Sequence, residues 1–103
     1  MKLLNLFFIS TVFYVCIGCS NEIGEACQSS TQCGIGRICD LNSKDGYCTI
    51  SPCSFESCPQ DSICVEFKDR QTFCMALCET SEECRDGYTC DQEYGVAPFC
   101  RQN

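Results

Sequence analysis

Hydrophobic residues are concentrated at the start of the chain, whereas polar residues and regularly placed cysteines fill the rest. One positive charge, Lys2, precedes a mainly apolar run over residues 3–15, and Asn21 and Glu22 mark its end. This pattern is typical of a secretory signal peptide, and the run is shorter than the roughly 20 apolar residues that span a membrane. We predict a signal peptide over residues 1–18 and a short tether over 19–26; a retained anchor is the disfavoured alternative.

No apolar pattern with a helical period follows the signal, and the cysteines instead form three groups of four. The spacings within a group are four or five, then five, then eight or nine residues. The groups span residues 27–48, 53–74 and 78–100, called units 1, 2 and 3, and their members are Cys27, Cys33, Cys39, Cys48, Cys53, Cys58, Cys64, Cys74, Cys78, Cys84, Cys90 and Cys100. A fixed period of this kind indicates a tandem array of small structural units.

Each unit is predicted to be a loop followed by a short β-hairpin. The polar segment between the first and second cysteines favours a loop or at most one helical turn. Between the third and fourth cysteines, β-forming residues flank turn segments at 44–46, 68–70 and 93–95, and Asp45-Gly46 favours a type I′ turn. The predicted fold class is a small disulfide-rich protein of three tandem four-cysteine units, with little helix after the signal.

Two further positions repeat with the cysteines. An aromatic residue precedes each fourth cysteine: Tyr47, Phe73 and Phe99. Three residues before each third cysteine lies a residue that tolerates a left-handed backbone: Gly36, Asp61 and Gly87. These residues are predicted to turn the chain between the second and third cysteines.

Cysteine content predicts an oxidising compartment and a disulfide framework. Of the 14 cysteines, Cys16 and Cys19 lie in the leader region, which leaves an even number that can all pair. Four cysteines allow three pairings; the third and fourth lie at the ends of one hairpin, so each is placed to bond one cysteine of the preceding loop. We favour first-to-third and second-to-fourth pairing and keep the other two open. The short linkers over 49–52 and 75–77 predict units packed end to end as a rod.

The leader ends in Val15-Cys16-Ile17-Gly18-Cys19-Ser20, which resembles the lipobox of bacterial lipoproteins. This resemblance implies that Cys19 is the first mature residue and carries diacylglycerol and an acyl chain. Cys16 stands where the family usually has Leu, and Ser20 would, by the same resemblance, favour the outer membrane. Cleavage by an ordinary signal peptidase after Gly18 or Ser20, giving a secreted protein, is the alternative.

The spacings Cys27-x5-Cys33-x5-Cys39 and Cys78-x5-Cys84-x5-Cys90 resemble the start of the N-terminal cysteine-rich domain of Dickkopf-type secreted proteins. They are also similar to short cysteine repeats in secreted and lipoprotein chains of some bacteria. Unit 2 matches less well because its first spacing is one residue shorter. The resemblance implies an extracellular binding role, without implying a signalling receptor as partner.

Charge and composition narrow the function classes. Once Lys2 is removed with the signal, six basic and fourteen acidic residues remain, a formal charge of −8, which argues against nucleic acid as a partner. The chain has no His, so no His-dependent catalysis is expected. Outside the leader no Cys-x-x-Cys pair would favour zinc, and residues 40–46 fit a hairpin turn better than a calcium loop. We expect no metal and no cofactor.

The favoured function is a non-enzymatic, extracytoplasmic binding or structural module whose partner is an extracellular protein or glycan. A lipid on Cys19 would hold it at the outer membrane or cell surface. The alternative is a secreted disulfide-rich protease inhibitor or toxin-like protein, since rigid loops lose little entropy on binding. Phe67 and Tyr94, near predicted hairpin tips, are the candidate contact residues.

Overall fold

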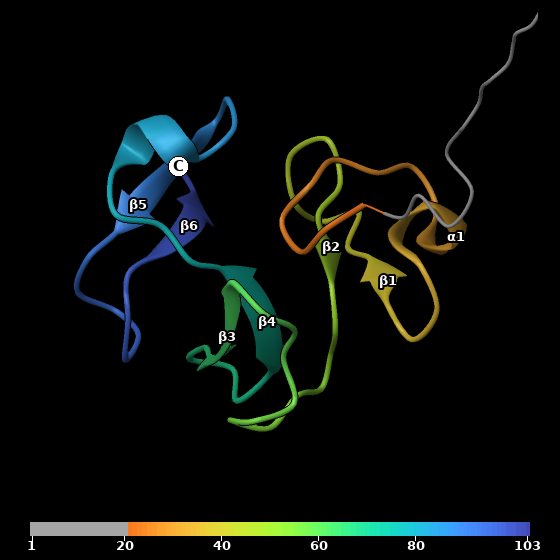
Figure 1. Ribbon diagram of the computed structural model, residues 1–103, viewed down its shortest axis with the longest axis horizontal. Helices are drawn as coiled ribbons and strands as arrows, with labels where there is room; N and C mark the ends of the chain where they lie inside the picture. The colour runs from red at the N-terminus through yellow and green to blue at the C-terminus, as the bar shows by residue number, and fades with distance from the viewer. Residues whose placement is uncertain (1–20) are drawn as a thin grey trace, which may run out of the picture.

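The computed structural model describes residues 21–103 (Figure 1). The predicted signal peptide, Cys16, the proposed lipidation site Cys19 and Ser20 lie outside the described residues. Over 21–103 the chain forms antiparallel two-stranded sheets joined by loops, with very little helix. No helix in this range is long and apolar enough to cross a membrane.

Each unit contains one hairpin, and the predicted fold class is confirmed. Unit 1 contains α1 (Ser30–Cys33), β1 (Ile38–Cys39) and β2 (Cys48–Thr49). Unit 2 contains β3 (Ser62–Glu66) and β4 (Thr72–Ala76), which form the longest pairing. Unit 3 contains the 3₁₀ helix η2 (Ser81–Glu83), β5 (Tyr88–Asp91) and β6 (Phe99–Gln102). Much of the remaining chain is loop, because every segment between cysteines is short.

The favoured disulfide pairing is confirmed in all three units. The bonds are Cys27–Cys39, Cys33–Cys48, Cys53–Cys64, Cys58–Cys74, Cys78–Cys90 and Cys84–Cys100. In each hairpin the third and fourth cysteines are direct cross-strand partners, as Cys64 and Cys74 are in unit 2. Directly opposed side chains share one face of a β-ribbon. Both disulfides of a unit therefore tie the preceding loop to the same face of its hairpin.

The same β-turn precedes the hairpin in every unit, as predicted. Turn 1 (34–37), turn 2 (59–62) and turn 3 (85–88) are each closed by a hydrogen bond from the last main-chain N–H to the first carbonyl oxygen. The third residues of these turns have φ of 78° at Gly36, 67° at Asp61 and 91° at Gly87. A left-handed third residue is what a type II turn requires.

Units 1 and 3 resemble each other more than either resembles unit 2. In unit 1 the main-chain N–H of Cys39 donates to the Ser30 hydroxyl at 3.0 Å. In unit 3 the N–H of Cys90 donates to the Ser81 hydroxyl at the same distance. Unit 2 has one residue fewer between its first two cysteines and forms a turn at 54–57 instead of a helical turn.

The turn at Asp45-Gly46 lies one residue earlier than the type I′ prediction places it. The Gly46 N–H donates to the Ser43 carbonyl oxygen, so Asp45, with φ of 60°, is the third residue of the turn. Gly46 leaves the turn against Cys27, and a Cβ on Gly46 would lie 2.0 Å from the Cys27 carbonyl oxygen. Close approach of this segment to Cys27 decides the turn, rather than the preference of the dipeptide.

Residues 21–26, predicted as part of a tether, are packed into the fold. The Gly24 N–H donates to the Cys48 carbonyl oxygen at 2.8 Å, and the Cys48 N–H donates to the Glu25 carbonyl oxygen at 3.0 Å. The side chain of Ile23 is buried in the core. The first described residues are therefore part of the packed fold.

The three units do not form the predicted rod. Figure 1 shows β3 and β4 between the other two hairpins, so that the chain follows an arc. Unit 3 contacts unit 1 directly, with the ring centroids of Tyr47 and Tyr88 5.6 Å apart. One core draws on all three units; its buried members are Ile23, Tyr47, Val65, Cys74, Met75, Tyr88 and Phe99. Each unit is too small to bury its apolar side chains alone, so the units share a core.

Candidate binding surfaces

The predicted contact residues Phe67 and Tyr94 are half-buried and packed together. Their rings stack with centroids 5.5 Å apart and planes inclined by 19°. Both rings also pack in T-shaped arrangements with Phe99, which is fully buried. As candidate contact residues the two rings were expected to be exposed, but in the structure they pack on each other and join unit 2 to unit 3. Their role in contacting a partner stays a prediction.

Arg101 covers this aromatic pair. Its guanidinium lies 4.3 Å from the ring centroid of Tyr94 and 5.5 Å from that of Phe67. It also forms an ion pair with Asp91 at 2.9 Å. A hydrogen bond from the Glu93 N–H, followed by those from Arg101 and Tyr94, lowers the pKa of the Asp91 carboxyl. The charged groups of Arg101 and Asp91 are thus paired within the protein, so their contact with the aromatic pair is structural.

Arg85 joins unit 3 to unit 1 and to the residues just before it. Its Nε donates to the Gly24 carbonyl oxygen at 2.8 Å, and Nη2 donates to the Gly46 carbonyl oxygen and to the Tyr88 hydroxyl. The guanidinium also lies 4.4 Å from the ring centroid of Tyr88 and 5.8 Å from that of Tyr47. We call these five residues the Arg85 junction.

Sequence reasoning missed Arg85, although the repeat contained a signal. Arg85 is the first residue of turn 3, where turns 1 and 2 have Gly34 and Pro59. A long cation at that position can reach carbonyl groups of another unit, which neither Gly nor Pro can do. Turn 3 is thereby fixed to unit 1.

The three units meet at Tyr47. Its hydroxyl oxygen accepts a hydrogen bond from the Ala76 N–H of β4 at 2.9 Å, while its ring packs beside Tyr88. Burial raises the pKa of Tyr47 to about 12, and burial also raises the pKa of Tyr88. A neutral Tyr47 therefore belongs to the folded arrangement of the units.

A hollow of about 260 Å³ lies between the three units next to this junction. Both aromatic or apolar and polar side chains line it; the lining residues are Asp40, Ser43, Tyr47, Phe67, Phe73, Met75, Tyr88, Arg101 and Gln102. Binding pockets for drug-sized molecules usually measure about 300–1,000 Å³. The hollow is suited to a small group or to one side chain of a partner.

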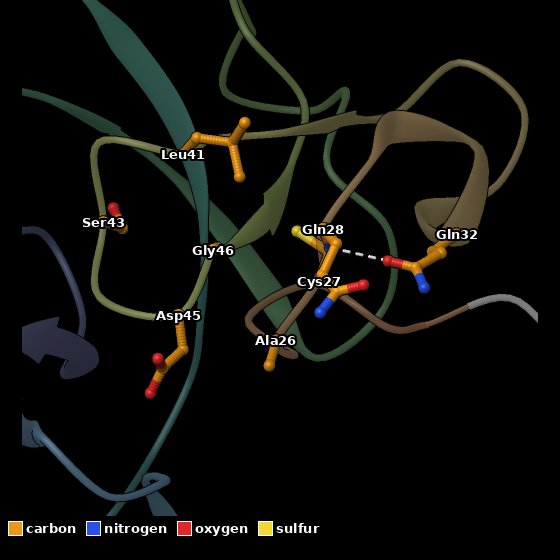
Figure 2. Close-up of a pocket in the computed structure, with 8 residues that line it drawn as sticks. All are labelled: Ala26, Cys27, Gln28, Gln32, Leu41, Ser43, Asp45 and Gly46. Carbon is orange, nitrogen blue, oxygen red and sulfur yellow. Dashed lines mark hydrogen bonds between the residues drawn. The ribbon is translucent and has the colours of Figure 1, made fainter.

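A larger depression of about 680 Å³ lies on unit 1 (Figure 2). Its walls are the segments 26–32 and 41–46, and the Gln28 N–H donates to the Gln32 side-chain oxygen at 2.6 Å. Figure 2 shows the side chains of Leu41 and Asp45 at opposite edges and pointing apart. This surface does not bring polar groups together around one point.

The most exposed large hydrophobic residues are on loops. They are Ile35, Val96, Leu41 and Phe55, and Ile35 is fully exposed. Ile35 lies between Gly34 and Gly36 at the second position of turn 1, where turns 2 and 3 have the polar residues Gln60 and Asp86. Sequence reasoning missed Ile35, and the difference from the other two units was the available signal.

The cysteine groups that could ligate a metal already form disulfide bonds. Three sulfur atoms in each unit lie within 4.8 Å of one another, and each belongs to a disulfide, whereas a metal would need thiolates. The Asp40 carboxylate of the predicted hairpin turn accepts hydrogen bonds from the Asn42 N–H and the Ser43 hydroxyl. Asp40 is thus used in shaping the loop.

No family model, curated protein or solved structure matches this chain. The resemblances to Dickkopf-type domains and to bacterial lipoproteins therefore stay predictions. The six disulfides and the joined hairpins support the coarser conclusion that the protein is an extracytoplasmic cysteine-rich module.

Proposed function

We propose that this chain is a non-enzymatic binding module held at the outer face of a membrane by a lipid on Cys19. Its partner is an extracellular protein or glycan. The observation that carries the proposal is that Asn21, only two residues after Cys19, is already hydrogen-bonded into the fold through Gln32. An anchor at that position would hold the module against the membrane without a flexible stalk.

Rigidity supports the binding role. Six disulfides close the three units, and the Arg85 junction and the Phe67–Tyr94 stack fix the units relative to one another. A preorganised surface loses less conformational entropy when it binds a partner. The loops of such a body can present Phe55 and Val96 in constant positions.

Turn geometry favours this proposal over a substrate-like protease inhibitor. The most exposed apolar side chain, Ile35, lies in a closed β-turn in which the Arg37 N–H donates to the Gly34 carbonyl oxygen at 3.2 Å. A bait segment that pairs with an enzyme as an added strand is extended. The alternative is tested by assaying the oxidised protein against a panel of serine and metalloproteases, where tight inhibition would support it.

The lipid is tested by producing the whole chain in a bacterium with two membranes and feeding an alkyne-tagged fatty acid. We expect the label on the protein, recovery in the membrane fraction, and an intact mass that begins at Cys19 and includes the acyl chains. A lipid-free mass beginning at Cys19 or at Asn21 would overturn the anchor.

Two cysteine variants provide the matched comparison. Cys19→Ala should abolish labelling, whereas Cys16→Leu should retain it, because Cys16 belongs to the segment removed with the signal. Label retained in Cys19→Ala would contradict the assignment to Cys19. Robust hydrolase or redox turnover by the pure oxidised protein would overturn the non-enzymatic part of the proposal.

A further inference from the structure

The three equivalent turns differ in what their second residue does. Turns 1, 2 and 3 share the same closing hydrogen bond and the same left-handed third residue. Their second residues are Ile35, Gln60 and Asp86, all exposed. A polar residue at an exposed turn tip needs no partner, but a fully exposed Ile presents its whole apolar surface to water.

Turn 1 is also bare around Ile35. Glycine lies on either side, and a Cβ built on Gly36 would meet nothing within 4 Å. Turn 3, by contrast, packs on unit 1, where a Cβ on Gly87 would lie 2.7 Å from the Lys44 side chain. Ile35 is therefore the only large side chain at the tip of turn 1. A tip of this kind can enter a lipid surface without burying polar side chains.

Turn 1 lies beside Asn21, the first residue that the structure describes. The Arg37 guanidinium donates to the Asn21 carbonyl oxygen at 3.0 Å, and the Asn21 N–H donates to the Gln32 carbonyl oxygen at 3.0 Å. Two peptide units separate Asn21 from Cys19, so their Cα atoms are at most about 8 Å apart. A lipid on Cys19 would place turn 1 next to the headgroup region of a bilayer.

We propose that Ile35 inserts into the boundary between headgroups and acyl chains, and that this second contact fixes the orientation of the module on the membrane. The inference rests on the proposed lipid anchor. One apolar side chain binds weakly, but the anchor keeps it at high local concentration. The exposed carboxylates of Glu22 and Glu25 lie near the same end of the chain, so a zwitterionic bilayer is the expected surface.

The absence of Trp from the chain provides a direct test. Lipidated full-length protein carrying Ile35→Trp is reconstituted into phosphatidylcholine vesicles, with Gln60→Trp as the matched control on turn 2. We expect the Ile35→Trp indole to emit at shorter wavelength and to be quenched by brominated acyl chains at least about two-fold more than the control. Intact mass verifies the lipid and the six disulfides in both variants.

The possible failures are distinguishable. A mass without lipid on Cys19 overturns the anchor and, with it, this inference. A lipidated Ile35→Trp protein whose indole is quenched no more than that of Gln60→Trp overturns only the membrane contact. Protection of the Ile35→Trp indole that rises with protein concentration and needs no vesicles would identify a second copy of the chain as the occupant, and would also overturn it.

Hydrogen exchange supplies a readout that does not depend on an introduced indole. In the unsubstituted lipidated protein, vesicles should slow exchange of the turn 1 amides at Ile35 and Gly36 relative to those of turn 2. Ile35→Gln should lower the vesicle-dependent protection of these amides about ten-fold, since Gln lacks the apolar surface. Equal exchange with and without vesicles would contradict insertion.

Discussion

Turn 1 and turn 3 have the same type of backbone turn, but turn 3 is packed on another part of the protein and turn 1 is exposed. Both end in a main-chain hydrogen bond, and both have glycine at the left-handed third position. Turn 3 begins with Arg85, whose guanidinium binds carbonyl oxygens of Gly24 and Gly46, and it is packed on unit 1. Turn 1 has no such cation at its first position and leaves Ile35 fully exposed. One repeated element thus serves internal packing in one unit and surface display in another.

The difference shows how a short array of stapled units can become one body. The disulfides fix each unit, but they do not join one unit to the next. Contacts between units depend on a few residues that vary among the copies, such as Arg85 and Tyr47. Substitutions at these residues should loosen the arrangement while the disulfides and hairpins persist.

The largest expected effect is at Gly46, which belongs to the surface that receives turn 3. Gly46→Ala would add a Cβ 2.0 Å from the Cys27 carbonyl oxygen, at a φ of 77°. Steric overlap and the left-handed backbone together should lower the free energy of unfolding by more than about 3 kcal/mol. Urea unfolding of the oxidised protein measures the loss.

Gly36→Ala on turn 1 is the matched control for that substitution. Its φ of 78° is nearly the same, but the added Cβ would meet nothing within 4 Å. Only the backbone cost of about 1 kcal/mol should remain. If the two variants lose similar stability, the close approach of Gly46 to Cys27 does not govern the fold.

Arg85→Ala should be the next largest change. It removes the hydrogen bonds to the carbonyl oxygens of Gly24 and Gly46 and the contacts with the rings of Tyr88 and Tyr47. We expect a loss of about 2–3 kcal/mol, because charge-assisted hydrogen bonds and partly desolvated cation–π contacts are both removed. Arg37→Ala, which removes one hydrogen bond at Asn21, should lose about 1 kcal/mol or less. The reverse order would mean that unit 3 is not held to unit 1 through Arg85.

Alkaline pH should weaken the junction of the three units. Burial raises the pKa of Tyr47 to about 12, whereas an unfolded tyrosine titrates near 10. Above pH 10 the unfolded chain releases this proton and the folded chain keeps it. Stability from this group is therefore complete below about pH 10 and falls by roughly 2 kcal/mol as the pH rises to about 12.

Phenolate absorbance and unfolding curves between pH 9 and 12 measure this effect, with Tyr47→Phe as the comparison variant. The substitution should remove the last-titrating phenol and make stability less sensitive to alkali. It also leaves the Ala76 N–H without its acceptor, so its stability at neutral pH should be about 1 kcal/mol lower. Titration of Tyr47 near pH 10 in the folded protein would contradict a buried, neutral hydroxyl.

The smallest effect concerns turn 2, which has Asp61 where the other two turns have glycine. Its φ of 67° is left-handed, a region that Asp tolerates at some cost. Asp61→Gly should therefore raise the free energy of unfolding by about 0.5 kcal/mol, visible as a small increase in the urea midpoint. A decrease would mean that the Asp61 side chain stabilises the turn more than its backbone conformation costs.

The hairpins and turns within each unit were predictable because the short spacing between cysteines restricts the backbone conformations that connect them. Short loops bring Cys64 and Cys74 opposite each other across a hairpin, which favoured one of the three possible pairings and left the other two open. Left-handed turn positions followed from residue type at Gly36 and Asp61. The exact turn at Asp45-Gly46 was not predictable, since it depends on the approach of Gly46 to Cys27.

The sequence by itself determined the class of the protein, its oxidising compartment and its three hairpins, since these depend on composition and on contacts within about 25 residues. It favoured one of the three possible cysteine pairings, and the structure decided among them. Only the tertiary structure decided that the units share one core and that Phe67 and Tyr94 are stacked against it. It also decided that Arg85 holds unit 3 to unit 1 while Ile35 stands free. These features join residues far apart in the chain, and whether a side chain is buried or displayed depends on how the units pack together.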